Sequence, residues 1–225
     1  MLFSPEDFFD IDHETSQPFH FQISDLLKYT MNNRLILVGA SRGIGRHFLE
    51  NEHTNEKDIL AIGSSESVYS LEKLSENIKA EKIQISDLSS IESPIKSWLR
   101  NLEPLESCRY AIVCCASQLG EVGGIFDEDI DVASWTDLFK INLLSHLKVI
   151  QLIEKYMTKH DTLRVVMFAG GGAAYGYPKF FNYSLTKVAT VRAVENIAME
   201  LESKQIDASI ISIAPGAVAT KMLEK

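Results

Sequence analysis

The sequence contains few cysteines and no long apolar run. Cys108, Cys114 and Cys115 are the three cysteines among 225 residues, and their spacing matches neither a metal-binding CxxC pair nor an even-numbered disulfide framework. The longest apolar runs, such as residues 111–116, have the length of a strand, whereas a helix needs about 18 apolar residues to cross a bilayer. The N-terminus also lacks a secretory signal pattern. We therefore expect a cytoplasmic protein with no metal site and no membrane partner.

Basic charge is scarce as well. The chain has 22 Lys and Arg against 31 Asp and Glu, a formal net charge of -9. No basic stripe is present to neutralise the phosphates of a nucleic acid, which is therefore not an expected partner. Residues 1–33 hold six of the acids and a single lysine. We expect residues 1–33 to form an acidic N-terminal extension and residues 34–225 to form one domain.

From residue 34 onward, short apolar runs alternate with longer amphipathic stretches. Near-continuous apolar runs are typical of parallel strands covered on both faces, and the stretches between them have helical periodicity. This alternation predicts an α/β Rossmann fold, a doubly wound parallel sheet of about six strands in a three-layer α/β/α arrangement. The expected strands are residues 35–38, 58–62, 81–85, 110–115, 163–168 and 207–213, and the expected helices include residues 44–51, 69–79, 134–160 and 183–203.

A glycine-rich segment joins the first expected strand to the first expected helix. Its sequence from residue 39 is Gly-Ala-Ser-Arg-Gly-Ile-Gly. Glycines at these positions permit a tight turn, close approach of the backbone to a pyrophosphate, and close packing of helix on strand, while the helix N-terminus attracts the anion. A plain turn is the alternative, but the strand-to-helix context favours a dinucleotide site. The residues expected to hold the dinucleotide here are Gly39, Ser41, Arg42, Gly43, Ile44 and Gly45.

The end of the second expected strand indicates which dinucleotide is bound. An acidic residue there would bind the adenosine ribose of NAD, but Ile62 is followed by Gly63, Ser64 and Ser65. Arg42 is placed to meet a 2'-phosphate, and the two serines can donate hydroxyl groups to it. We therefore expect a preference for NADP(H). NAD(H) stays open, because Arg42 can also be an ordinary solvated surface charge.

A tyrosine and a lysine stand four residues apart at the start of the last long helix. Tyr183 and Lys187 then project side by side, because four residues make about one helical turn. An adjacent buried cation is expected to lower the pKa of a phenol from about 10 toward 7, the range suited to acid/base catalysis. A YxxxK spacing alone is often surface decoration, but here it follows a dinucleotide cradle and a glycine-rich turn.

In this order the motifs resemble those of the short-chain dehydrogenase/reductase family, over about residues 34–225. The family implies hydride transfer between a nicotinamide cofactor and a small-molecule carbonyl or alcohol substrate. Tyr183 would be the acid/base, Lys187 would lower its pKa and hold the nicotinamide ribose, and Asn142 would keep a relay water in place. The resemblance adds further cofactor-binding residues: Asp87, Leu88, Ala116, Pro215, Gly216, Val218 and Thr220.

Three of these residues have simpler readings. Asn142 can merely cap or kink its helix, Asp87 can be a helix N-cap, and Thr220 can be a surface hydroxyl. The family also implies dimerisation through the helices around Asn142 and Tyr183, so we expect a homodimer.

The sequence departs from the family pattern at the catalytic serine. Counting back thirteen or fourteen residues from Tyr183 reaches Gly170 and Ala169, which have no hydroxyl group. Losing such a donor can cost on the order of 100-fold in rate. Ser117 and Tyr175 are the expected stand-ins.

Two further departures concern the cofactor wall and the substrate lid. The usual Asn-Asn-Ala-Gly after the fourth strand reads Cys114-Cys115-Ala116-Ser117, so backbone groups there need other partners. The sequence ends ten residues after Pro215, so we expect the pocket to lack the usual lid. The leading hypothesis is therefore an NADP-dependent oxidoreductase. The alternative is a catalytically weak or inactive nucleotide-binding protein with a regulatory or partner-binding role.

Overall fold

A computed structural model describes residues 33–51, 58–127, 131, 133, 135–216, 218 and 220. The expected N-terminal extension therefore lies outside the described residues, apart from Asn33. Within the described ranges no helix is both long and apolar enough to span a membrane.

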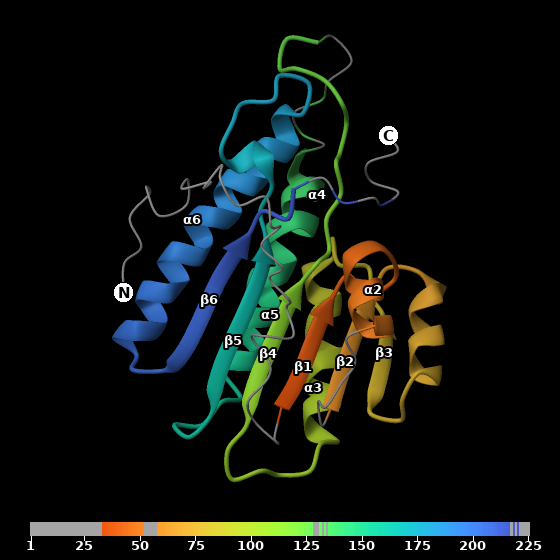
Figure 1. The fold of residues 1–225 in the computed structure, drawn as a ribbon, viewed down its shortest axis with the longest axis vertical. Helices are drawn as coiled ribbons and strands as arrows, with labels where there is room; N and C mark the ends of the chain where they lie inside the picture. Colours follow the sequence, from red (N-terminus) through yellow and green to blue (C-terminus); the bar gives the residue numbers. More distant parts are fainter. Residues whose placement is uncertain are drawn as a thin grey trace, which may run out of the picture.

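Six parallel strands form one sheet, whose arrows all point the same way in Figure 1. Their spatial order is β3-β2-β1-β4-β5-β6, so the direction of winding reverses between β1 and β4. Ligands of such sheets bind at the carboxyl ends of the strands beside this switch point. The predicted Rossmann fold is confirmed. The strands are β1 (Asn33–Val38), β2 (Asp58–Gly63), β3 (Ile78–Lys82), β4 (Arg109–Cys114), β5 (Thr162–Phe168) and β6 (Asp207–Ile213).

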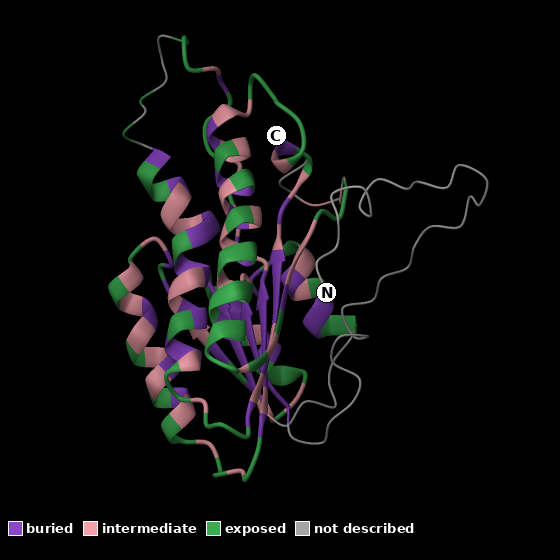
Figure 2. Ribbon diagram, turned by 90° about the vertical axis from the view of Figure 1, so that its left-hand side faces the viewer, coloured by how far each residue is buried: buried purple, intermediate pink, exposed green. Residues whose placement is uncertain are grey.

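Helices lie on both faces of the sheet, as Figure 2 shows with the sheet seen edge-on. One apolar cluster joins the sheet to α3, α5 and α6, and another joins it to α2 and η2. The described helical elements are α2 (Gly43–Asn51), η2 (Glu66–Lys73), η3 (Leu88–Ile91), α3 (Glu92–Arg100), α4 (Trp135–Phe139), η5 (Lys140–Leu144), α5 (Ser145–Glu154), η6 (Gly171–Ala173) and α6 (Phe181–Ser203).

Strand β1 shows why the central strands are apolar along their whole length. Leu35 and Leu37 pack in the cluster of α2, whereas Ile36 and Val38 pack in the cluster of α3, α5 and α6. All four are at most 1% exposed. The central strands therefore fill both cores and hold the turn after β1 in a rigid frame.

The prediction for the third strand was wrong. It placed the strand at residues 81–85, but β3 spans Ile78–Lys82 and pairs with β2. The apolar residues Ile83 and Ile85 are buried just beyond the strand. The error arose because β3 is an edge strand with alternating burial, so its apolar content is low. The predicted helix at residues 69–79 is likewise the shorter 3-10 helix η2.

The long helix predicted at residues 134–160 is interrupted. α4 passes into a π-helical turn, η5, and then into α5, which ends at Glu154. Asn142 lies inside this π turn. Such turns are rare and often mark functional sites.

Candidate active site

The turn after β1 lies against the chain that follows β4. The amides of Gly39 and Ala40 both donate to the Ile62 carbonyl oxygen at 2.8 Å. Gly39 has a φ of +100°, and a Cβ atom on it would lie 2.4 Å from the Ala116 amide nitrogen. Only glycine fits this conformation and this contact. The turn is thus shaped by the backbone, with no side chain between it and β4.

The start of α2 completes the cradle. A Cβ atom on Gly45 would lie 2.5 Å from the Gly39 carbonyl oxygen, so glycine is needed for the helix to approach the turn. Gly43, at the start of α2, has a φ of +61°, and Thr220 lies beside it, with Cγ2 3.6 Å from an ideal Cβ. The free amides of a helix start bind anions. The cradle therefore fits a pyrophosphate, and Thr220 lies at its rim as predicted.

Hydroxyl groups gather between the cradle and the end of β2. Ser41 Oγ accepts from the Ser65 amide at 3.3 Å, and Ser67 Oγ donates to the Ser41 carbonyl oxygen at 3.1 Å. Ser65 and Ser67 also share a hydrogen bond of 2.7 Å between their hydroxyls. Ser64 and Arg42 are exposed. Ser67 was missed from sequence, because it lies in the first turn of η2 rather than at the strand end.

The carboxylate nearest in sequence to this serine cluster, that of Glu66, forms an ion pair with Lys82. Glu66 follows Ser65 directly, but its Oε1 atom pairs with Lys82 Nζ at 2.5 Å. This pairing satisfies the carboxylate with the edge strand β3. The residues directly after β2 thus present serine hydroxyls, and their nearest carboxylate is ion-paired.

Tyr183 and Lys187 lie together on the first turns of α6. Lys187 Nζ is 5.2 Å from the centre of the Tyr183 ring and donates to the Phe168 carbonyl oxygen at 2.9 Å. Lys187 is 2% exposed, whereas Tyr183 is half-buried. Phe168 is the last residue of β5. The hydrogen bond to its carbonyl therefore ties the lysine to the carboxyl end of the sheet.

The pKa of Tyr183 differs from the expectation. Burial raises the pKa of Tyr183 above its ordinary value of 10.0. Burial lowers the pKa of Lys187 from 10.5 to about 8, although the nearby Cys115 thiol acts in the opposite direction. In the chain alone the phenol pKa is therefore raised rather than lowered, and burial is the cause.

Ala169 and Gly170, the two residues from which the sequence predicts the catalytic serine to be missing, directly follow β5. A Cβ atom on Gly170 would lie 3.4 Å from the Tyr183 hydroxyl oxygen. Gly170 has φ 174°, an extended conformation that any residue adopts. Ala169 is 7% exposed, and its amide donates to Ile213 in β6. Of the two residues, Gly170 is therefore the one that faces the Tyr183 hydroxyl.

The structure also locates the predicted stand-ins. Ser117 Oγ is buried and has no hydrogen-bond partner among the described residues, and Tyr175 is 64% exposed. The Tyr177 hydroxyl, which sequence reasoning did not select, lies 2.8 Å from an ideal Cβ on Gly171, the residue after Gly170.

Comparison with known proteins identifies this arrangement. The family model described as short chain dehydrogenase matches residues 33–225. The chain belongs to the short-chain dehydrogenase family. Like the relatives that follow, members of this family bind a nicotinamide cofactor and act on small molecules as oxidoreductases.

Individual relatives are distant. The benzil reductase ((S)-benzoin forming) of Saccharomyces cerevisiae is 25% identical over 200 residues, covering 85% of this chain and 74% of the relative. A 3-oxoacyl-(acyl-carrier-protein) reductase of Staphylococcus epidermidis is 24% identical over 202 residues, covering 85% and 78%. A short-chain dehydrogenase structure from Streptomyces avermitilis has a TM-score of 0.72 at 20% identity, covering 87% and 69%. The structure of ElxO with NADP bound has a TM-score of 0.70 at 19% identity, covering 86% and 77%.

The family asparagine is fully engaged within the chain. Asn142 Oδ1 accepts from the Gln118 amide at 2.8 Å, and its Nδ2 donates to the Gln118 carbonyl at 2.9 Å and to Thr186 Oγ1 at 3.1 Å. Thr186 Oγ1 in turn donates to the Tyr183 carbonyl at 2.7 Å. Asn142 thus joins the segment after β4 to the turn of α6 that carries Tyr183, and it lies in the π turn η5.

The Asp87 carboxylate caps a helix. Asp87 Oδ1 accepts from the Ser89 amide at 3.0 Å and from the Ser89 hydroxyl at 2.6 Å. These hydrogen bonds lower the pKa of Asp87 below its ordinary value. The N-cap alternative is therefore confirmed, and the Asp87 side chain stays exposed at the carboxyl end of the sheet beside half-buried Leu88.

The backbone amides after β4 are hydrogen-bonded although the asparagine of the family pattern is absent there. The amides of Cys115 and Ala116 both donate to the Val38 carbonyl, at 2.7 and 2.8 Å. Ala116 is 7% exposed, and the cysteines of this chain are free. The cofactor wall is thus closed by backbone bonds, with Ala116 against Gly39. On the far side of the cleft, Pro215 and Gly216 are exposed after β6, and Val218 is half-buried.

The loop after β4 is hydrogen-bonded to the loop that precedes α6. Gly123 pairs with Phe180 in an isolated bridge, and the Gly123 amide donates to Lys179 at 2.7 Å. Phe181 then stacks on Trp135, with ring centroids 5.4 Å apart. Figure 1 shows both loops rising beyond the carboxyl ends of the strands. They flank Tyr183, which follows directly in α6.

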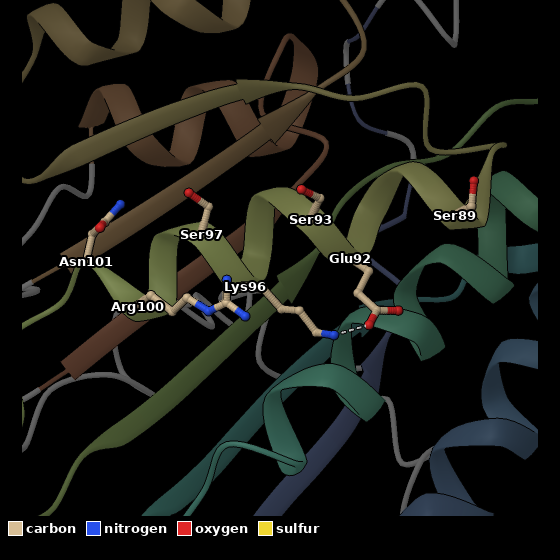
Figure 3. A pocket seen from close by; sticks show the side chains of 7 residues that line it. All are labelled: Ser89, Glu92, Ser93, Lys96, Ser97, Arg100 and Asn101. Atoms are coloured by element: carbon tan, nitrogen blue, oxygen red, sulfur yellow. Dashed lines mark ion pairs between the residues drawn. The ribbon is translucent and has the colours of Figure 1, made fainter.

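A separate open groove runs along α3 and is shown in Figure 3. Its lining includes the ion-paired Glu92 and Lys96, but none of the residues predicted to bind cofactor or substrate. Among the described residues, no cluster of His, Cys, Asp and Glu has the composition of a metal site. The groove is lined by Ser89, Glu92, Ser93, Lys96, Ser97, Arg100 and Asn101.

Proposed function

We propose that this protein is an NADP(H)-dependent oxidoreductase that interconverts a carbonyl compound and its alcohol, with Tyr183 as the acid/base. The observation that carries the proposal is the pairing of Tyr183 and Lys187 at the carboxyl end of β5. The glycine cradle follows β1 and so lies at the same edge of the parallel sheet. Bound nicotinamide supplies or accepts the hydride. The chain's own residues handle the proton and the orientation.

Tyr183 would exchange a proton with the substrate oxygen. Its half-buried hydroxyl faces Gly170, where no side chain blocks an incoming carbonyl. Burial keeps the phenol protonated, which suits proton donation to a reduced substrate. Lys187, with a pKa of about 8, is charged at neutral pH and stabilises the phenolate that donation leaves behind. Asn142 would hold this part of α6 in place and keep a relay water, as the family resemblance implies.

The preference for NADP(H) is supported by the residues around the end of β2. Arg42, in the turn after β1, and Ser64 and Ser65, after β2, are all exposed, while Glu66 is paired with Lys82. A guanidinium is well suited to bind a 2'-phosphate. The remaining proposed cofactor contacts are Gly39, Ser41, Gly43, Ile44, Gly45, Asp87, Leu88, Ala116, Lys187, Pro215, Gly216, Val218 and Thr220.

A catalytically weak nucleotide-binding protein is the second candidate. The absence of a hydroxyl at Gly170 favours it, because the substrate carbonyl then has one positioned donor fewer. Some relatives, such as the benzil reductase, are reductases that act on carbonyl groups. This favours the first candidate, an active oxidoreductase. The two candidates differ in whether turnover depends on Tyr183.

We also propose a cytoplasmic homodimer built on a single domain of residues 34–225. The helices around Asn142 and Tyr183 support the dimer, since Leu144, Leu185 and Val188 are between 38% and 49% exposed there. Free cysteines agree with a reducing compartment. Size-exclusion chromatography with light scattering measures the oligomeric state.

The test begins with cofactor binding. Titration of NADPH and NADH, followed by nicotinamide fluorescence, should give a lower Kd for NADPH. A panel of ketones, aldehydes and quinones is then screened with wild type and Tyr183→Phe. Turnover that disappears in Tyr183→Phe while NADPH binding persists supports the enzyme. NADPH binding without any turnover supports the second candidate, and no binding of either cofactor rejects both.

A further inference from the structure

A chain of hydroxyl groups links the segment after β2 to the turn after β1. The Ser65 and Ser67 hydroxyl oxygens lie 2.7 Å apart, and Ser67 Oγ lies 3.1 Å from the Ser41 carbonyl oxygen. Ser41 precedes α2, whereas Ser65 directly precedes η2 and Ser67 lies in its first turn. This hydroxyl chain is therefore a tertiary contact at the carboxyl end of the sheet. The function proposed above assigns Ser67 no role.

The direction of each hydrogen bond in the hydroxyl chain follows from the number of protons. A serine hydroxyl has one proton and two lone pairs. A carbonyl oxygen only accepts, so the Ser67 proton goes to Ser41. Ser67 then has no proton for its other bond, so Ser65 donates and Ser67 accepts. The hydroxyl protons of Ser65 and Ser67 are thus both used within the protein.

A second hydrogen bond joins the same two segments, with a backbone amide as the donor. The Ser65 amide donates to Ser41 Oγ at 3.3 Å. The Ser41 side chain lies against the last residue of β2, because a Cβ atom on Gly63 would lie 2.1 Å from Ser41 Oγ. Ser41 is 9% exposed. Its hydroxyl accepts in the bond from Ser65, so this bond does not use the Ser41 proton.

The backbone of Ser67 is held independently of its hydroxyl group. The Ser67 carbonyl oxygen accepts from Ser70 Oγ at 2.8 Å and from Arg46 Nη1 at 3.0 Å. Ser67 is also exposed, and substitutions of exposed residues usually change stability little. Removing the Ser67 hydroxyl should therefore break the hydroxyl chain and leave the fold intact.

We propose that Ser67 is a positioning residue of the cofactor site, its hydroxyl fastening the segment after β2 to the glycine cradle. Because Ser67 takes up the Ser65 proton, the Ser65 hydroxyl contributes to cofactor binding through Ser67 rather than by donating to a phosphate. Fixing the segment before the cofactor arrives reduces the conformational entropy that is lost on binding. The inference rests on the proposed function, which assigns the 2'-phosphate of NADP(H) to this segment.

Hydrogen–deuterium exchange of the cofactor-free protein measures the fastening itself. The amides of residues 64–68 should exchange about fivefold faster in Ser67→Ala, because the segment opens more often. Ser67→Thr keeps a hydroxyl group and should exchange like wild type. Ser70→Ala is the matched control, since its hydroxyl belongs to the same element but donates to the Ser67 carbonyl, which keeps Arg46 as a partner.

A double-mutant cycle tests whether Ser65 acts through Ser67. The Kd for NADPH, measured by nicotinamide fluorescence, should rise about fivefold in Ser67→Ala and about threefold in Ser65→Ala. The double variant should bind like Ser67→Ala alone, because both substitutions break one chain of hydrogen bonds. Ser67→Thr should restore the wild-type Kd, and Ser70→Ala should stay within about twofold of it.

The outcomes separate this inference from the proposed function. Unchanged exchange of residues 64–68 in Ser67→Ala overturns the inference, whether or not a cofactor binds. So do additive losses in the double variant, since they would mean that Ser65 contacts NADPH by itself. Both results leave NADPH binding by the wild-type protein and the role of Tyr183 intact. Failure of the wild-type protein to bind NADPH would instead reject the proposed function, and the exchange experiment would still measure the fastening.

Discussion

The Tyr183 hydroxyl faces Gly170 so closely that a Cβ atom on the glycine would lie 3.4 Å from the phenolic oxygen. This contact is an ordinary van der Waals distance, and the extended backbone of Gly170 accepts any side chain. A serine would therefore fit without rearrangement. Its hydroxyl would lie beside the group that exchanges a proton with the substrate.

We expect Gly170→Ser to raise kcat for carbonyl reduction at least about tenfold, since a positioned donor is worth on the order of 100-fold. Ala169→Ser is the matched control, because Ala169 is buried at the end of β5 and adjacent side chains of an extended chain point to opposite sides. Steady-state kinetics with one ketone measures both. A gain in Ala169→Ser and none in Gly170→Ser would show that the serine position is misassigned.

Arg42→Ala should weaken NADPH binding by about tenfold or more and leave NADH binding nearly unchanged, because a charge-assisted contact to the 2'-phosphate is lost. Arg46→Ala is the control. Arg46 is held by Glu50 at 2.7 Å and by the Ser67 carbonyl at 3.0 Å, so it has other partners than a ligand. Equal weakening of NADPH and NADH in Arg42→Ala would contradict the proposed contact.

Gly39→Ala should destabilise the fold and abolish cofactor binding. Backbone strain at a φ of +100° costs about 1–3 kcal/mol by itself, and the new methyl group would collide with the Ala116 amide. Urea unfolding measures the loss. Gly176→Ala is the control, since a Cβ atom there meets nothing within 4 Å. If Gly39→Ala were as stable as wild type, the close approach described here would be wrong.

His146 makes stability depend on pH in acid. Burial lowers its pKa to about 3 in the fold, against an ordinary value of 6.5, so below pH 6.5 the unfolded chain binds a proton that the folded chain does not. The free energy of unfolding should therefore fall as pH decreases from 6.5 toward 3. In His146→Gln this part of the decline should disappear, whereas the exposed His160→Gln should retain it. Thermal melts across this range measure the difference.

Lys187 makes the free energy of unfolding depend on pH in alkaline solution. Its pKa is about 8 in the fold against 10.5, so between these values the unfolded chain binds more protons. The contribution of Lys187 to stability should rise with pH over this window. Lys187→Met removes it, and urea unfolding at pH 7.5 and 9.5 measures the change.

The sheet could be predicted because its central strands are apolar on both faces. β1 and β4 are buried along nearly their whole length, so periodicity located them to within about two residues. Edge strand β3 has no such signal, since its sequence Ile-Lys-Ala-Glu-Lys alternates. The apolar Ile83 and Ile85, which drew the prediction, belong to the core beyond the strand.

The site was predictable where local spacing determines geometry. The glycines of the cradle and the four-residue step from Tyr183 to Lys187 follow from turn and helix geometry alone. The choice between Ala169 and Gly170 could not be predicted from local geometry, because it depends on which of the two positions faces α6. Ser67 was also missed, since its hydrogen bond to the Ser41 carbonyl oxygen is a tertiary contact.

The bridge between Gly123 and Phe180 has a mechanical consequence. Phe180 immediately precedes α6, so the loop after β4 cannot swing outward without pulling on the helix that carries the acid. Under the proposed function, we expect binding of a bulky molecule and alignment of the Tyr183 phenol to be coupled, because displacing Gly123 would also displace the start of α6. Size selection would then act on turnover as much as on affinity.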